Sequence, residues 1–306
     1  MSEQLLLDII MTTYNQENYI AEAIQSVLLQ KVNFPFRLII GEDCSTDKTN
    51  SICKKYAEKY PSIIILLENN KNIGLVKNYK QCFEKSDAKY IAFLEGDDYW
   101  TDPNKIMMQI RILESDKDVG LVHANCNILI EEKAKIKQTP IKIVNKCIEF
   151  QGYIYNNLIH NNFIYACSAM FRRDLISINE FDYLIQKKLL TIDYHLWLTI
   201  SLTHKISYIS ENVGVYRVSM QSISNNFNFE KQVLFAKTKR DIIINFISKN
   251  PIPHYSIKDA NNEYNMSLLL KAISSLDIKN ARKYIKEFSV NGIYLVFKKV
   301  FLQKIP

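Results

Sequence analysis

The first 130 residues of the chain alternate between short apolar runs and segments with helical periodicity. Strands are expected over residues 5–13, 36–41, 63–67, 90–94 and 119–130, and helices over residues 16–30, 47–59, 75–85 and 103–115. Strict alternation of this kind predicts an α/β fold with a mostly parallel, Rossmann-like sheet flanked by helices and joined by right-handed crossovers. Ligands of such sheets bind beyond the carboxyl ends of the strands.

The second half of the chain is less regular. Residues 152–162 predict a loop with a short helix, 163–171 a strand, 194–202 a helix and 206–218 a pair of strands, and helical patterns follow over residues 231–248, 257–274, 278–287 and 293–302. The change of pattern near Phe227 is the best candidate for a domain boundary. We therefore expect a catalytic domain over residues 1–225 and a C-terminal helical region over residues 226–306 that contacts an acceptor, a membrane or a second subunit.

Composition excludes several classes of protein. With 47% hydrophobic and 23% charged residues the chain is an ordinary globular protein, and its net charge of +7 suits an anionic partner. No motif for nucleic-acid recognition accompanies that charge, so we expect no nucleic-acid partner. The six cysteines lack zinc-ligand spacing and indicate reduced thiols in a cytosolic protein. No apolar stretch is long enough to span a membrane, and the N-terminus resembles no signal peptide.

Three carboxylates, Glu95, Asp97 and Asp98, directly follow the apolar run at residues 90–94. Asp102 and Pro103 are expected to begin the next helix as N-cap and first helical residue, which leaves these three acids unexplained. Carboxylates held this close raise each other's pKa unless a cation lies among them. Oxygen ligands on a short turn suit Mg²⁺ or Mn²⁺, whereas the alternative is a solvated acidic turn.

Polar clusters follow three of the expected strands. They are Thr12 to Asn15, Glu42 to Ser45 and Glu95 to Asp98, and the alternation places all three at one edge of the sheet. Helix capping can account for Asn15 or Ser45, but not for Asp43 or the triple acid. Their convergence predicts a site for a nucleotide phosphate and a metal ion.

Four segments occur in a recognisable order: TTYNQENYIAEAIQSVLLQ, EDCSTDKT, NKNIGLVKNY and YIAFLEGDDYW. Together they resemble the family 2 inverting glycosyltransferases with the GT-A fold, particularly the bacterial enzymes that build surface polysaccharides such as capsule or O-antigen. The resemblance covers roughly residues 5 to 225, and it is specific only as an ordered set.

The resemblance implies a role for each matching residue of the donor site. Thr13, Tyr14 and Glu17 lie where the family holds the nucleotide of the sugar donor, and Asp43 where a carboxylate recognises the base. Lys77 and Asn78 stand where many members have Arg-Asn.

The acidic turn takes the place of the family's D-x-D motif. Asp97 is then the ligand of Mn²⁺ or Mg²⁺, and Asp98 extends the site towards the donor sugar or the acceptor. Glu95 replaces the usual first Asp near the ribose, which changes its reach.

A catalytic base is implied in the segment TIDYHLWL. Inverting transfer needs a carboxylate that takes the proton of the acceptor hydroxyl, and Asp193 is the expected base. Asp193 could instead cap the following helix, or do both. Arg217 belongs to YRVSMQSIS, which resembles a loop that closes over the donor, although Ser219 replaces a His that is common there.

We therefore expect a metal-dependent inverting transferase that moves a sugar from a nucleotide-sugar, a UDP-sugar by preference, to a glycan or lipid-linked glycan. A sugar nucleotidyltransferase is disfavoured because residues 5–15 lack the glycines of a triphosphate loop. A catalytically inactive transferase-like module that binds glycan or tethers partners at a membrane is the alternative. The C-terminal helix at residues 293–304 mixes apolar residues with Lys, so it could pack on the core or contact the inner face of the membrane peripherally. Otherwise we expect a cytoplasmic location, and the oligomeric state stays open.

Overall fold

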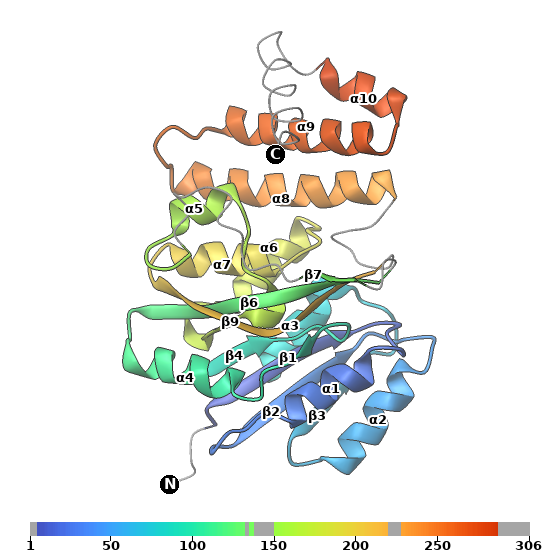
Figure 1. Ribbon diagram of the computed structural model, residues 1–306, viewed down its shortest axis with the longest axis vertical. Helices are drawn as coiled ribbons and strands as arrows, with labels where there is room; N and C mark the ends of the chain where they lie inside the picture. The colour runs from blue at the N-terminus through green and yellow to red at the C-terminus, as the bar shows by residue number, and fades with distance from the viewer. Residues whose placement is uncertain (1–4, 132–134, 138–149, 220–227, 287–306) are drawn as a thin grey trace. The chain divides into compact units, whose positions relative to one another are not determined.

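The computed structural model describes residues 5–131, 135–137, 150–219 and 228–286, and the chain divides into two compact units, residues 1–218 and 219–306. The first unit is an α/β domain. The described part of the second contains the helices α8 (Phe229–Lys249), α9 (Ile257–Ser274) and α10 (Ile278–Ile285), with α9 packed on both of the others (Figure 1). The predicted α/β class with a C-terminal helical extension is confirmed, and the boundary at residue 225 stays a prediction.

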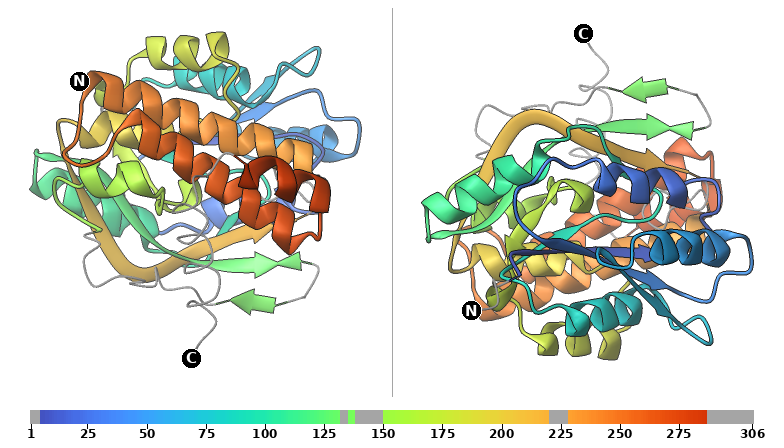
Figure 2. Two further views of the ribbon diagram at one scale, coloured as in Figure 1. Left: turned by 90° about the horizontal axis from the view of Figure 1, so that it is seen from above. Right: turned by 90° about the horizontal axis from the view of Figure 1, so that it is seen from below.

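One sheet runs through the first unit in the order β3-β2-β1-β4-β8-β6-β9-β5, with β7 beside β6. Its strands are β1 (Leu7–Thr13), β2 (Phe36–Glu42), β3 (Ile64–Glu68), β4 (Tyr90–Phe93), β5 (Tyr99–Trp100), β6 (Val119–Ile130), β7 (Lys135–Lys137), β8 (Met170–Arg172) and β9 (Lys205–Val218). The longer pairings, β1 with β2 and β4, β2 with β3 and β6 with β9, are parallel. Antiparallel pairing is confined to the short strands β5, β7 and β8. Figure 2 shows β6 and β9 curving side by side over their whole length.

Seven α-helices accompany the described sheet: α1 (Ile20–Leu28), α2 (Thr49–Lys59), α3 (Leu75–Lys85), α4 (Lys105–Ser115), α5 (Tyr155–His160), α6 (Ile178–Gln186) and α7 (Asp193–Ser201). Alternate residues of β1 point to opposite faces of the sheet. Leu7, Ile9 and Met11 join a core with α1 and α4. On the other face Phe93 packs its ring 4.9 Å from Tyr79 of α3 and 5.8 Å from Trp197 of α7. The sheet is buried on both faces, as parallel sheets are.

Three local predictions were wrong in detail. Residues 205–218 form the single strand β9 rather than a pair, and within residues 163–171 the strand β8 begins only at Met170, after a 3₁₀ turn at Ala166–Ser168. Helix α4 begins at Lys105, after the N-cap Asn104, so Asp102 is not its cap. The carboxylate of Asp102 instead accepts from the backbone N–H of Asn104 at 2.8 Å, which closes a turn before the helix.

Two further expectations concern cysteines and membranes. Cys53, Cys82, Cys126 and Cys167 are buried free thiols, Cys44 is only half-buried, against the expectation of a core position, and Cys147 lies outside the described residues. Among the helices that the structure describes, none combines the length and the apolar character needed to cross a bilayer. The predicted helix at 293–302 also lies outside the described residues.

Candidate functional site

The turns that follow β1 and β2 interlock. The backbone N–H of Asn15 donates to Ser45 Oγ at 2.9 Å, and Asn15 Oδ1 accepts from the N–H of Thr46 at 2.8 Å. Both turns contain a non-glycine residue with a left-handed backbone, Asn15 at φ 52° and Cys44 at φ 60°. Such conformations cost free energy and cluster at functional sites, where the surrounding contacts hold them in place.

The acidic turn lies directly against the end of β1. The N–H of Gly96 donates to the carbonyl oxygen of Thr12 at 3.1 Å. A Cβ atom on Gly96 would lie 2.5 Å from Gln16 Oε1 and 2.9 Å from Thr13 Oγ1. Any side chain at this position would therefore force the side chains of Gln16 and Thr13, or the turn itself, to shift.

Hydrogen bonds connect the acids to residues of β1 and α3. Thr13 Oγ1 donates to Gln16 Oε1 at 2.7 Å, and the Gln16 side chain in turn hydrogen-bonds Asp97. The Tyr79 hydroxyl donates to Glu95 Oε1 at 2.9 Å. Burial, followed by the charges of Asp97 and Asp193, raises the pKa of Glu95 to about 7. Burial therefore disfavours the charged form of Glu95, and the neighbouring acids add to that effect.

Asp98 is buried with one carboxylate oxygen unpartnered. Its Oδ1 accepts from the backbone N–H of Arg217 at 2.8 Å, whereas Oδ2 meets no hydrogen-bond donor among the described residues. Burial, and then the charges of Asp97 and Glu95, raise the pKa of Asp98 well above its usual value. An orphaned buried oxygen of this kind indicates a group that a bound ligand or cation completes.

The Arg217 side chain crosses from β9 to the acidic turn and is almost fully buried. Its Nε donates to the carbonyl oxygen of Asp97 at 2.7 Å, and its guanidinium pairs with Glu22 at 2.7 Å and with Glu131 at 3.5 Å. The guanidinium carbon also lies 4.6 Å from the centroid of the Tyr19 ring. These contacts fix the backbone of the acidic turn.

Asp193 is the first residue of α7, and the N-cap is Ile192, so the capping alternative was wrong. Thr191 Oγ1 donates to Asp193 Oδ1 in a short hydrogen bond, and Asn162 Nδ2 donates to Oδ2 at 3.2 Å. Burial is the main cause that raises the pKa of Asp193. Because the charges of Asp193 and Asp97 both act on Glu95, the structure brings the expected base to the same place as the acidic turn.

Three other predicted donor residues lie directly after β2 and on α3. Asp43 accepts from the N–H groups of Ile73 and Gly74 at 2.8 and 2.9 Å, which anchors the loop before α3. Asn78 is buried and donates to the carbonyl oxygen of Gly41 at 2.7 Å, while Lys77 on the same helix is exposed. Two of the three residues therefore have structural partners, and their roles towards a donor stay predictions.

Tyr14 and Glu17 lie in the turn after β1. The Tyr14 side chain is 44% exposed, which leaves its ring available to a ligand. Glu17 Oε2 accepts from the N–H of Lys48 at 3.0 Å, so it helps to hold the two interlocked turns together.

Sequence reasoning missed the residues that support the acids. Gln16 and Tyr79 contact the acidic turn, and Asn162 and Thr191 hold Asp193. Gln16 directly follows the Thr13-Tyr14-Asn15 segment and could have been suspected. Tyr79 and Asn162 carry no such signal because only the packing of distant segments brings them to the site.

The acids suit a metal ion that takes few protein ligands. Within the described ranges, no three His, Cys, Asp or Glu side chains are grouped to hold a metal by themselves. The orphaned Asp98 oxygen and the raised pKa values of Glu95 and Asp97 nevertheless fit a cation beside this turn. Mg²⁺ and Mn²⁺ commonly bind through one or two carboxylates together with substrate phosphates.

Comparison with known proteins decides the family. The model of "Glycosyl transferase family 2" matches residues 8–178, which is more than half of the chain. The chain belongs to glycosyl transferase family 2. The resemblance to family 2 that was drawn from the four sequence segments is thereby confirmed.

Two relatives of known sequence are consistent with this family assignment. The chain is 30% identical over 211 residues to the protein Rv1520 of Mycobacterium tuberculosis, covering 69% of this chain and 58% of the relative, so it spans little more than half of that protein's length. It is 30% identical over 256 residues to the Escherichia coli enzyme WfgD, a UDP-Glc:alpha-D-GlcNAc-diphosphoundecaprenol beta-1,3-glucosyltransferase, covering 82% of this chain and 89% of the relative.

A solved structure confirms the fold. The mannosyltransferase PcManGT of Pyrobaculum calidifontis, crystallised with GDP-Man and Mn²⁺, superposes with a TM-score of 0.59 at 15% identity, covering 98% of this chain and 81% of that protein. The predicted GT-A fold is therefore confirmed for this family 2 member.

Proposed function

We propose that this chain transfers a sugar from a nucleoside-diphosphate donor, by preference a UDP-sugar, to a hydroxyl of a glycan or lipid-linked glycan, with inversion and with a divalent cation. One observation carries the proposal: Glu95, Asp97, Asp98 and Asp193 gather at the edge where β1 and β4 end. An acid cluster and a separately held carboxylate are the two parts that such a transfer needs.

Asp193 acts as the base in this proposal. Its carboxylate oxygens accept hydrogen bonds from Thr191 and Asn162, which fix the direction of the remaining lone pairs. The raised pKa of Asp193 makes it a stronger proton acceptor than an exposed aspartate. It would remove the acceptor hydroxyl proton as the oxygen attacks the anomeric carbon from the face opposite the departing nucleotide.

The acidic turn serves the donor. Asp97 would hold a divalent cation, which when bound offsets the charge that develops on the diphosphate. Glu95, fixed by Tyr79, and Asp98, fixed by the backbone of Arg217, frame the same site. Arg217 binds acids of the protein itself, so we assign it to positioning of the turn in addition to the donor contact expected from sequence.

The acceptor class rests on a relative. WfgD is named for a diphosphoundecaprenol acceptor, and this chain matches 89% of its length. We infer that a lipid-linked glycan at the cytoplasmic face of a bacterial membrane, in surface polysaccharide synthesis, is the natural acceptor. Peripheral membrane contact of the C-terminal region agrees with such an acceptor.

Two substitutions test the roles of the acids. Asp97→Ala should abolish Mn²⁺-dependent binding of UDP and the slow release of UDP from UDP-sugars. Asp193→Asn should keep Mn²⁺-dependent UDP binding and lower turnover by about 10²–10⁴-fold, because only the proton acceptor is lost. UDP binding is measured by calorimetry and turnover as UDP released from a panel of UDP-sugars.

Asp174→Asn is the matched control, since Asp174 is an exposed carboxylate away from the acidic turn. It should bind and turn over like the wild type. Wild-type turnover in either test variant would refute the assignment of that residue. A folded wild type that binds UDP but never releases it from any UDP-sugar would favour the catalytically inactive module.

A further inference from the structure

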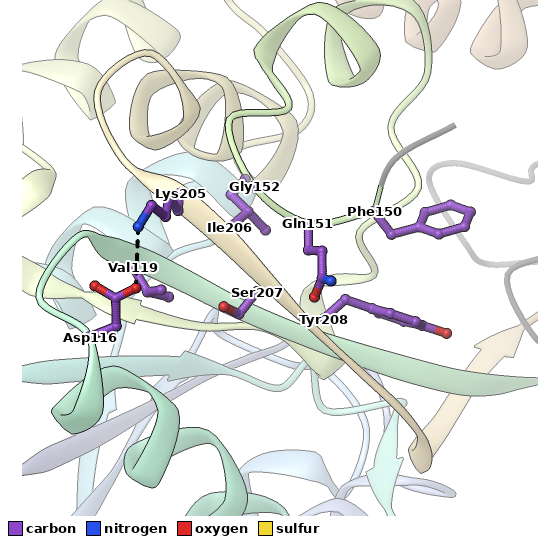
Figure 3. Close-up of a pocket in the computed structure, with 9 residues that line it drawn as sticks. All are labelled: Asp116, Val119, Phe150, Gln151, Gly152, Lys205, Ile206, Ser207 and Tyr208. Carbon is purple, nitrogen blue, oxygen red and sulfur yellow. Dashed lines mark hydrogen bonds and ion pairs between the residues drawn. The ribbon is translucent and has the colours of Figure 1, made fainter. Parts of the chain in front are cut away.

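A second site lies at the opposite edge of the sheet. A pocket of about 620 Å³ opens beside the first residues of β6 and β9, whereas the acidic turn contacts Arg217 near the end of β9 (Figure 3). The residues of β6 that pair with Tyr208 and Arg217, His123 and Leu129, are six residues apart, which corresponds to about 20 Å at roughly 3.3 Å per residue. The pocket is therefore separate from the donor site.

The wall of the pocket is built by a segment that pairs with β9. Gly152, at φ +95°, and Ile206 exchange two backbone hydrogen bonds of 2.7 and 2.9 Å. His123 Nε2 donates to the carbonyl oxygen of Phe150 at 2.9 Å, since a carbonyl can only accept. Hydrogen bonds at Phe150 and at Gly152 thus fix the backbone on both sides of Gln151.

Polar and aromatic groups line opposite ends of the pocket. Figure 3 shows the charged pair of Asp116 and Lys205 at one end, the rings of Phe150 and Tyr208 at the other, and Gln151 and Ser207 between them. The two ring centroids are 5.6 Å apart, with the planes inclined by 43°. The pocket thus places two half-buried aromatic rings next to amide and hydroxyl groups that both donate and accept.

The charges of the pocket disfavour an anion. Lys205 Nζ lies 3.4 Å from a carboxylate oxygen of Asp116 and 3.4 Å from one of Asp118. This lysine is therefore already shared by two acids, and because the charge of Arg172 also acts on Asp116, the charged groups at this end roughly neutralise one another. A nucleotide or phosphate would find no cation in this pocket that is not already shared with an acid, and a purely apolar ligand would cover the Gln151 amide and the Ser207 hydroxyl without hydrogen-bonding them.

We propose that this pocket binds a neutral oligosaccharide. A pyranose ring presents an apolar C–H face that stacks on aromatic rings and a rim of hydroxyls that hydrogen-bond amides, hydroxyls and carboxylates. The volume lies within the range of pockets that enclose small organic ligands. This inference rests on the proposed function, since a transferase that extends a glycan gains from holding a part of that glycan away from the reacting end.

Holding the acceptor at a second point raises its effective concentration at the donor site. Loss of the pocket should therefore raise the KM for a long acceptor while leaving UDP binding and the hydrolysis of UDP-sugars unchanged. The donor would then react at the edge formed by the carboxyl ends of the strands, and the glycan would be bound at the edge formed by their amino ends.

Ligand-observed saturation-transfer NMR on the full chain provides the test, with maltotriose, cellotriose and tri-N-acetylchitotriose as neutral probes. At least one probe should show saturation transfer to its ring protons in the wild type. Ser207→Phe, which fills the pocket, and Tyr208→Leu, which removes one ring, should reduce this signal at least fivefold. Gln151→Ala, at an exposed position, should reduce it more weakly and keeps the test valid if the other two variants fail to fold.

Asp97→Ala separates this proposal from the proposed function. It should lose Mn²⁺-dependent UDP binding and keep the oligosaccharide signal, whereas Ser207→Phe should do the reverse. The pocket proposal is overturned if none of the three probes gives a signal, or if the signal survives unchanged in folded Ser207→Phe and Gln151→Ala. If UDP binding and turnover fail in the wild type, the proposed function fails instead.

Discussion

At the scale of single residues, Lys105 is the most unusual group outside the acidic turn. It is fully buried at the start of α4, and its Nζ donates to Gln109 Oε1 at 2.7 Å and lies 4.1 Å from the centroid of the Trp100 ring. The amide nitrogen of Gln109 donates to the carbonyl oxygens of Val122 and Ser168, so its oxygen requires a donor such as Lys105. Burial lowers the pKa of Lys105 to about 7.

A pH dependence of stability follows. The folded-state pKa of Lys105 lies below its unfolded value near 10.5. Between about pH 7 and 10.5 the unfolded chain therefore binds more protons than the folded protein. The contribution of Lys105 to stability consequently rises with pH across that window. Lys105→Met removes this contribution. The free energy of unfolding of the variant minus that of the wild type should fall by about 2–4 kcal/mol from pH 7 to pH 10.

Urea unfolding at one-unit pH steps measures this difference, with Lys117→Met as the control at an exposed position. If the free energy of unfolding changed with pH in the same way in the wild type and in Lys105→Met, Lys105 would titrate normally and the prediction would be wrong.

At the scale of elements, the site depends on how closely the acidic turn approaches the end of β1. A Cβ on Gly96 would overlap the side chains of Gln16 and Thr13, so Gly96→Ala must shift either these side chains, one of which hydrogen-bonds Asp97, or the turn itself. We expect this variant to lose about 1–3 kcal/mol of stability and at least tenfold in Mn²⁺-dependent UDP affinity.

Gly120→Ala is the matched control, because its Cβ would overlap His204 Cβ and Leu175 Cδ1, each at 2.7 Å, and none of these residues belongs to the donor site. It should lose comparable stability, measured by thermal melting, and retain more UDP affinity by calorimetry. Equal losses of affinity in both variants would mean that overpacking anywhere in the sheet, rather than the position of the turn, controls donor binding.

At the scale of the whole molecule, the two compact units differ in their cores. The first has a broad core on both faces of its sheet, whereas the described cluster of the second is built around Leu268, Leu269 and Tyr284. Small cores give low stability. We therefore expect residues 219–306 to unfold before residues 1–218.

Two optical probes separate the units. Both tryptophans, Trp100 and Trp197, lie in the first unit, whereas α8 to α10 contribute much of the helical far-UV signal. On urea titration, part of the helical signal should be lost before tryptophan fluorescence changes. UDP with Mn²⁺ should shift only the fluorescence transition, because ligand binding stabilises the unit that binds it. Coincident transitions would show that the two units unfold as one.

The sequence by itself determined the order and type of most elements and which polar clusters share an edge. Both conclusions depend on local periodicity and on the rule that parallel strands end at one edge. Helix 75–85 and strand 119–130 were predicted with the bounds that the structure shows. The acids of the site were also predictable because apolar strands and capping leave them unexplained.

Only the tertiary structure decided what each polar residue contacts. Asp43 anchors the loop before α3, Tyr79 holds Glu95, and Arg217 binds acids of its own chain. The pocket beside Tyr208 likewise exists only because Gly152 pairs with Ile206 of β9. Such partners lie far apart in the sequence, and packing rather than local pattern selects them, since a buried polar group must take whichever partner the fold brings within reach.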